Sequence, residues 1–506
     1  MLRRLFLLTG LLTFLLTGGA FAAESFQEIQ SHITSFTLKN GMTFVVVERH
    51  HAPVASFVTY ADVGSVQEVT GITGIAHIFE HIAFKGSPAI GGRNYEEERL
   101  ALDRVDQAFF ALREEQHKGA KADPKKVKEL ESAFQAAQDG AGKFVVKNEY
   151  GDAIERTGGR DLNAGTGSDA TRYFFSLHSN SAELWFFLES EHFLRPVMRE
   201  FYKEKDVVME ERRMRTESQP TGKLVEEALH AAYKAHPYGE PVVGHMSDLL
   251  EITRPDAEAF FRKYYGPGSL TAVIAGDVDP KKMREFAETY FGRIPAAPKP
   301  APLRTVEPPQ EAEHRVTLRV KSERLVLMAY HKPDMFHPDN AVYRAISGVL
   351  SEGRSSRLYS SLVRDQKIAV QAFGFPDLPG KKYPGLFTFV AVTAPGHENS
   401  EAEAALQSEI ERLKKEPVTA EELDGVKRRA RAGLIAGLGD NLQLANSLAD
   451  WQALTGDWHN LFRDLERLDA VTPADIQRVA KEIFTANNRT IATIEPLAAE
   501  SEAPQK

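Results

Sequence analysis

The chain has 506 residues, a formal net charge of −9 at pH 7 and no cysteine. The lack of cysteine excludes disulfide bonds, thiolate nucleophiles and thiolate metal ligands. The negative net charge argues against partners such as nucleic acid or anionic membrane surfaces. A chain of this length exceeds what one hydrophobic core usually supports, so we expect two or more domains.

The first residues have the pattern of a secretory signal. Arg3 and Arg4 precede an apolar run from Leu5 to Leu16, and the small-residue site Ala20-Phe21-Ala22 follows. The run is too short and too poorly flanked for a good membrane anchor. We therefore predict that residues 1–22 are a cleaved signal peptide, that the protein is exported, and that no membrane span remains. An uncleaved N-terminal anchor is the alternative.

A break in composition divides the rest of the chain. Residues 292–315, GRIPAAPKPAPLRTVEPPQEAEHR, are rich in proline and alanine and show no regular spacing of hydrophobic residues. Such a composition is typical of an extended linker. We predict a first domain over residues 23–295, a linker over 296–313, a second domain over 314–496 and a flexible tail over 497–506.

The two halves share an order of predicted elements. Residues 252–280 run helix, turn and apolar strand, and residues 471–496 repeat this order, both opening with a Thr and Pro start signal. Chance recurrence of a common order is the alternative to duplication. Stretches such as VASFVTYADVG and TRYFFSLH alternate like strands and mix with long amphipathic helices. We therefore predict an α+β fold with two homologous α/β halves, each a mixed or antiparallel sheet flanked by helices.

A helical hairpin interrupts the first half over about residues 97–142. Leu102, Val105 and Phe109 mark an apolar stripe at helical spacing, and Asp123-Pro124 supplies the cap and first turn of a second helix. We expect this hairpin to be a surface insertion rather than a domain.

The segment GIAHIFEHIAFKG, residues 74–86, places titratable side chains inside an apolar helix. His77 and His81 lie four residues apart, on one face of the helix, where two imidazoles can bind one metal ion. Glu80 lies beside that face, where it can take a proton from water at the metal. A buried helix with two hydrogen-bonded histidines is the alternative. However, this set of groups costs several kcal/mol of desolvation unless a cation compensates it.

A catalytic zinc ion requires three protein ligands and one open position, so a third ligand must lie elsewhere in the chain. In residues 202–217, helical spacing places two carboxylates on one face with two valines that we expect to be buried. These four residues are Glu204, Val207, Val208 and Glu211. We expect Glu210, one step around the helix, to face solvent.

Three other residues compete for the role of third ligand. Glu189, Glu191 and His192 lie in LWFFLESEHFLRP, on a predicted helix whose apolar residues surround them. A lone histidine in such a place is more often a core or boundary residue. Helical spacing therefore favours Glu211 but leaves these alternatives open.

Three motifs follow one another in the chain: GITGIAHIFEHIAFKGS, DLNAGTGSDATRYFFSLHSNSAELWFFLESEHFLRPVM and EKDVVMEERRM. Together they resemble the pitrilysin/insulinase family of zinc metallopeptidases, the inverzincins, including bacterial members similar to the mitochondrial processing peptidase. The resemblance covers nearly the whole chain after the signal, and the second half is similar to the inactive homologous domain of the family.

The resemblance implies one zinc ion per chain and a role for each residue of the site. The ligands would be His77, His81 and Glu211, the general base Glu80, and the supporting acid Glu204. It also implies that Asn163 and Ala164, in an edge strand beside the metal, bind the main chain of a peptide substrate. A plain strand and turn is the alternative for that segment.

The function implied is that of a zinc-dependent endopeptidase that hydrolyses peptides or unfolded polypeptides, located in the periplasm. The alternative is a non-catalytic or partner-dependent subunit with a binding or scaffold role.

The second half departs from the family pattern in one place. Relatives that act alone carry an arginine and a tyrosine there, whereas this chain keeps Arg364 but has Val370-Gln371 where the tyrosine would fall. Stabilisation of the transition state from that side is then incomplete. We therefore expect a homodimer, or a heterodimer with a homologous subunit that lacks the metal motif. Arg357 and Tyr359 are expected to pack.

Overall fold

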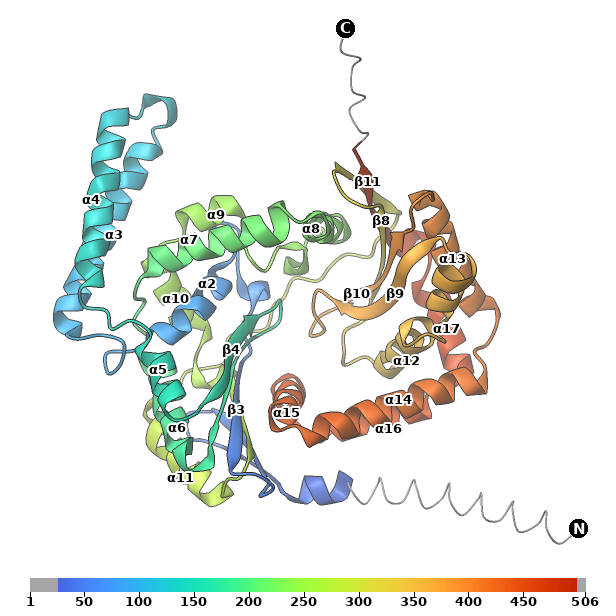
Figure 1. The fold of residues 1–506 in the computed structure, drawn as a ribbon, viewed down its shortest axis with the longest axis horizontal. Coiled ribbons are helices and arrows are strands. Elements are labelled where there is room, and N and C mark those ends of the chain that lie inside the picture. The colour runs from blue at the N-terminus through green and yellow to red at the C-terminus, as the bar shows by residue number, and fades with distance from the viewer. Residues whose placement is uncertain (1–25, 498–506) are drawn as a thin grey trace, which may run out of the picture.

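The computed structural model describes residues 26–497. The predicted signal peptide, 1–22, and most of the predicted tail, from residue 498 on, lie outside these residues. The described chain forms two halves, each built on one β-sheet (Figure 1). Within this part of the chain, no helix has both the length and the apolar character needed to cross a membrane.

The first half contains a six-stranded sheet in the order β1-β2-β6-β3-β5-β4. β2 and β6 run parallel, and the other neighbours run antiparallel. The strands are β1 (Ile33–Thr37), β2 (Thr43–Glu48), β3 (Val54–Ala61), β4 (Arg160–Thr166), β5 (Thr171–His178) and β6 (Leu270–Gly276). The two segments that alternate like strands in the sequence therefore form β3 and β5.

The second half contains a five-stranded sheet in the order β7-β11-β8-β10-β9. The strands are β7 (His314–Val320), β8 (Leu325–Lys332), β9 (Ala369–Leu378), β10 (Gly385–Thr393) and β11 (Arg489–Pro496). Its one parallel pair is β7 with β11. If β1 is set aside, both sheets place their strands in the same chain order: first, fifth, second, fourth, third. The prediction of two homologous halves in an α+β fold is confirmed.

Helices flank both sheets. In the first half they are α2 (Ile75–Ile82), α3 (Tyr95–Gln116), α4 (Pro124–Gly142), α5 (Glu149–Arg156), α6 (Ala182–Leu194), α7 (Phe201–Arg212), α8 (Pro220–Ala232), α9 (Met246–Glu251), α10 (Arg254–Tyr264) and α11 (Pro280–Tyr290). In the second half they are α12 (Asn340–Ser351), α13 (Asn399–Lys415), α14 (Ala420–Gly439), α15 (Asn441–Thr455), α16 (Asn460–Ala470) and α17 (Pro473–Ile483). α10 and α17 both begin at a threonine capping box and precede the second strand of their sheet's parallel pair.

Each half gives one helix to the sheet of the other. α8 of the first half packs on β7, β8 and β11, and α15 of the second half packs on β3 and β6 (Figure 1). The first sheet is consequently covered by its own helices, including α2, on one face and by the second half on the other. These exchanged helices make the two halves one hydrophobic assembly.

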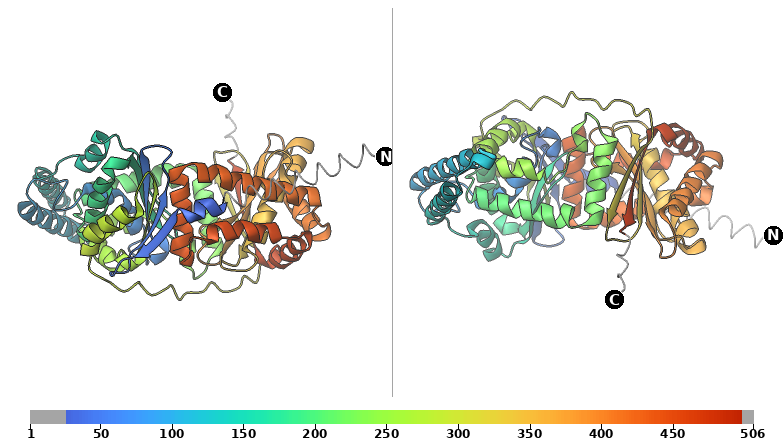
Figure 2. Two further views of the ribbon diagram at one scale, coloured as in Figure 1. Left: turned by 90° about the horizontal axis from the view of Figure 1, so that it is seen from below. Right: turned by 90° about the horizontal axis from the view of Figure 1, so that it is seen from above.

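Two segments leave the compact body of the protein. α3 and α4 pack against each other and project from the first half (Figure 1), with Leu102, Val105 and Phe109 buried along α3. Residues 295–313 contain neither helix nor strand and run along the outside from one half to the other (Figure 2).

Candidate metal centre

The helix that carries the histidine motif begins at a tight contact between two glycines. Gly74, at φ 90°, precedes α2, and Gly244, at φ 79°, lies against it. A Cβ atom on Gly74 would lie 2.6 Å from the carbonyl oxygen of Val243, and one on Gly244 would lie 2.2 Å from that of Thr73. Only glycine fits either position, because the backbone is left-handed and the space is filled by main-chain atoms.

Two carboxylates satisfy the backbone N–H groups at the start of α2. Glu68 accepts hydrogen bonds from the N–H groups of Gly74 and Ala76, at 2.7 and 2.8 Å. Asp248 accepts them from the segment just before the helix, including Thr73 through both its N–H and its hydroxyl. Burial raises the pKa of Glu68 to about 8, although the two N–H groups oppose that shift. The first turn, and with it the position of His77, is thus fixed from outside the helix.

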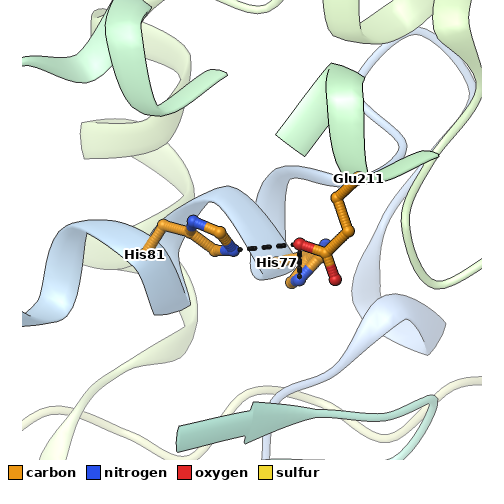
Figure 3. Close-up of side chains that lie close together, drawn as sticks. All are labelled: His77, His81 and Glu211. Atoms are coloured by element: carbon orange, nitrogen blue, oxygen red, sulfur yellow. Dashed lines mark ion pairs between the residues drawn. The ribbon is translucent and has the colours of Figure 1, made fainter. Parts of the chain in front are cut away.

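His77, His81 and Glu211 come together although 130 residues separate the last two in the chain. Glu211 Oε2 lies 3.4 Å from His81 Nε2 and 3.7 Å from His77 Nε2 (Figure 3). These separations are too long for hydrogen bonds, which end near 3.2 Å. They are close to the ~3.3–3.6 Å between neighbouring ligand atoms of a tetrahedral zinc site with bonds of about 2.0–2.2 Å. The three residues therefore fit a zinc ion.

The environment treats the two histidines differently. Burial lowers the pKa of His77, and the charges of Glu80 and Glu211 oppose that shift. Burial also works against protonated His81, but Glu204, Glu211 and Glu80 outweigh it and raise the pKa of His81 above its usual value. The surroundings thus favour the neutral form of His77, which is the form that binds a metal. At His81 the surrounding carboxylates favour a positive charge.

Two cationic side chains that the sequence analysis did not single out complete the surroundings. Lys85 Nζ lies 2.6 Å from Glu204, whose other oxygen faces His81 Nδ1 at 3.6 Å. Glu204 is therefore on the opposite side of the His81 ring from Glu211. Arg215 pairs with Glu211 Oε1, the oxygen turned away from the histidines, at 2.5 Å. Lys85 and Arg215 each follow a ligand by four residues, so helical spacing would have found both.

Glu80 lies on the helix that carries the two histidines, and Asn163 and Ala164 lie on a strand that contacts this helix. Glu80 is half-buried on α2, directly before His81. Asn163 and Ala164 lie in β4, the last strand of the first sheet, which contacts α2. The Asn163 side chain is exposed and accepts a hydrogen bond from the N–H of Ala164. Glu80 is thus on the metal-binding helix itself, and the strand expected to bind a peptide lies next to that helix.

The competing ligands lie apart from this group. Glu189, Glu191 and His192 are buried in α6, and the His192 ring packs between aromatic rings such as that of Phe79. Glu210 faces solvent, with a side chain 57% exposed.

The burial expected for the valines of α7 is only half correct. Val208 is fully buried, but Val207 is 50% exposed. The expectation for Val207 was therefore wrong, because it lies at the margin of the buried face.

Family models and a curated protein match most of this chain. The family model "Insulinase (Peptidase family M16)" matches residues 43–134, and "Peptidase M16 inactive domain" matches residues 251–430. The zinc protease PqqE of Helicobacter pylori is 30% identical over 481 residues, which cover 91% of this chain and 92% of that protein.

Solved structures share the fold. A protease from Helicobacter pylori superposes with a TM-score of 0.76 at 27% identity, over 92% of this chain and 99% of the other. The periplasmic protease PqqL of Escherichia coli shares the fold, with a TM-score of 0.67 at 16% identity, over 92% of this chain and 47% of the other. As the sequence motifs predict, this chain belongs to the insulinase/pitrilysin (M16) family of zinc peptidases.

Proposed function

We propose that the protein is a zinc-dependent endopeptidase that hydrolyses peptides or unfolded polypeptides. The observation that carries this proposal is the convergence of His77, His81 and Glu211, at separations suited to one zinc ion, with Glu80 beside them. A purely structural histidine pair would be expected to form hydrogen bonds. Here the two Nε2 atoms instead lie 3.4 and 3.7 Å from a shared carboxylate oxygen, close to the distance between neighbouring ligand atoms of a zinc ion.

In this proposal each residue has one task. His77, His81 and Glu211 hold one zinc ion, which when bound acidifies water and polarises a carbonyl group. Glu80 takes the proton of the attacking water and delivers it to the leaving amine. Glu204, which is held by Lys85, faces the Nδ1 side of His81 at 3.6 Å, and its charge favours this orientation of the ring.

The surroundings suit an extended substrate. β4 ends the sheet, so one of its edges is open to an added strand. A cavity of about 580 Å³ lies between β4 and β5 on one side and α15 on the other, with Arg172 and Asp450 in its wall. In this proposal a peptide lies along β4, contacts Asn163 and Ala164 through its main chain, and enters the space between the halves.

Export and assembly are further parts of the proposal. Residues 1–22 act as a cleaved signal that directs the chain to the periplasm, the compartment named for the similar Escherichia coli protein PqqL. The chain works as a homodimer or with a homologous subunit that lacks the metal motif. In support, Arg364 is 59% exposed and paired with its neighbour Asp365, and Val370 is exposed. Arg357, in contrast, pairs with Glu422 and is buried.

The decisive experiment compares wild type with Glu80→Gln. We expect one equivalent of zinc at the proposed catalytic centre in both proteins, and chelator-sensitive cleavage of a quenched fluorescent peptide library by wild type alone. Loss of a general base lowers the rate by about 10²–10⁴-fold. If wild type binds zinc at this centre but cleaves nothing, even with a homologous subunit added, the binding or scaffold role replaces the peptidase.

A further inference from the structure

A second group of metal-binding side chains lies outside the proposed catalytic centre. His230 is near the end of α8, Glu240 follows a short 3-10 turn, Pro237–Gly239, and His245 directly precedes α9. One ligand atom from each lies within 4.8 Å of the other two. Three residues within 16 positions of the chain thus present two imidazoles and a carboxylate to one point.

Local contacts explain only part of this arrangement. His245 Nε2 and Glu240 Oε2 lie 2.7 Å apart, a normal hydrogen bond. The His230 ring stacks on that of His245, with centroids 5.5 Å apart and planes at 17°, yet it makes no hydrogen bond among residues 26–497. Two protonated rings at this distance would repel each other. A shared cation would draw both rings and the carboxylate together.

The surrounding charge favours a cation. Glu240 and Asp248 both lie close enough to Glu68 that their charges raise its pKa. The nearby Arg212 is already engaged, since it donates to the carbonyl of Gly244 and pairs with Glu226. Among residues 26–497, neither Glu240 nor Asp248 pairs with a lysine or an arginine, so a divalent ion would offset their negative charge.

We propose that His230, Glu240 and His245 bind a second divalent transition-metal ion, Zn²⁺ in particular, independently of the catalytic centre. Two imidazoles and one carboxylate form a donor set that zinc accepts readily. Binding requires the Glu240 to His245 separation to open from 2.7 Å toward ~3.3–3.6 Å. Both side chains are about one third exposed, so small rotations are sufficient.

The place of this group gives the ion a structural consequence. The N–H of His245 donates to Thr73 Oγ1 at 2.9 Å, and the preceding Gly244 packs against Gly74 at the start of α2. An ion that fixes His245 therefore also holds the loop that supports the first turn of α2. We expect occupancy of the second group to raise the melting temperature of the protein.

The test begins by emptying the first centre. The full chain with His77→Ala and His81→Ala is titrated with Zn²⁺ by calorimetry and with Co²⁺ by visible absorption, which reports coordination directly. We expect one ion to bind. Adding His230→Ala, an exposed residue whose loss leaves the fold intact, should weaken that binding at least about tenfold, and so should His245→Ala.

A matched control separates this site from any paired histidine at the surface. His397 also lies beside a carboxylate, Glu401 at 3.2 Å, but belongs to neither metal-binding group. His397→Ala should leave the titration unchanged.

The proposal is overturned if the parent variant binds no ion, or if His230→Ala and His245→Ala leave its affinity as it was. Neither outcome bears on the peptidase, which is tested through Glu80.

Discussion

Three glutamates of α7 lie within about two helical turns but meet different surroundings. Glu211 faces both imidazoles, and Glu204 lies between His81 and Lys85. Glu210 points to solvent and pairs with Arg213. One helix therefore carries a ligand, a supporting carboxylate and a solvated carboxylate, which can be compared by the same substitution.

We expect zinc affinity to fall in a fixed order when each glutamate is changed to glutamine. Glu211→Gln should lose the most, because a neutral amide replaces a charged ligand. Glu204→Gln should lose about 10–100-fold, the usual effect of removing a partner that orients a ligand. Glu210→Gln should match wild type. Competition with a chromophoric chelator measures the zinc affinity of all three variants. If Glu210→Gln lost as much zinc affinity as Glu211→Gln, the assignment of Glu211 as the third ligand would be wrong.

Spacing in the sequence could predict which residues converge but not how each is buried. His77 and His81 follow from a separation of four residues, and the third ligand follows from the pattern of α7 together with the family motifs. Val207 was misplaced because it lies about 100° around the helix from Val208. One side of such a face meets the core while the other meets water, and a single helix pattern does not reveal which.

At the scale of elements, α2 depends on partners that no local pattern reveals. Its first N–H groups donate to Glu68, and the segment before it is held by Asp248, which is far away in the sequence. The sequence predicted a helix over residues 74–86, and the structure ends α2 at Ile82 before a 3-10 turn, Ala83–Lys85. Periodicity therefore located the element, whereas contacts from outside the helix set its exact bounds.

Glu68 makes stability depend on pH. Its pKa is about 8 in the folded protein against an ordinary 4.5, so the folded state binds more protons between these values. The contribution to stability is complete below pH 4.5 and is lost as pH rises through 8. In wild type we expect the free energy of unfolding to decline by a few kcal/mol between pH 5 and 9. In Glu68→Gln we expect this decline to be smaller, because the titrating group is absent. Urea denaturation at several pH values measures this decline.

Asp248 provides the control for this prediction. Although burial opposes it, hydrogen bonds from Thr73 and Gly71 hold the pKa of Asp248 below its usual value. Its own contribution is lost only as pH falls through that lowered pKa, but its charge helps to raise the pKa of Glu68, so Asp248→Asn should move the decline to lower pH without abolishing it. Equal slopes in wild type and Glu68→Gln would contradict the role given to Glu68.

At the scale of the whole molecule, the halves are joined by more than the linker. α8 and α15 are exchanged between the sheets, and Asp450 of α15 pairs with Arg172 of β5 and with Lys381. The sequence could predict two related halves because each repeats one order of elements. It could not predict the exchange, because the apolar face of α8 looks the same whether it covers its own sheet or the other.

One carboxylate of the first half binds a loop of the second. Asp169 is buried and accepts hydrogen bonds from the hydroxyl of Tyr238 and from the backbone N–H groups of Lys381 and Lys382, at 2.8 and 3.1 Å. The loop around Lys382 also reaches the first half through Asp62. Asp169 therefore fixes the distance between the halves on this side.

We expect Asp169→Asn to loosen the two halves without unfolding either. Both N–H groups of the loop donate to the same Asp169 oxygen, so the amide oxygen can still accept from them, but without the negative charge these hydrogen bonds weaken by about 1–2 kcal/mol in total. Hydrogen exchange should then speed up at Lys381 and Lys382 and stay unchanged in β3 and β10. Asp365→Asn, at an exposed position where the carboxylate pairs with the neighbouring Arg364, should leave hydrogen exchange unchanged in both places. If exchange rises equally throughout both sheets, the substitution unfolds the protein and the separate role of this contact is refuted.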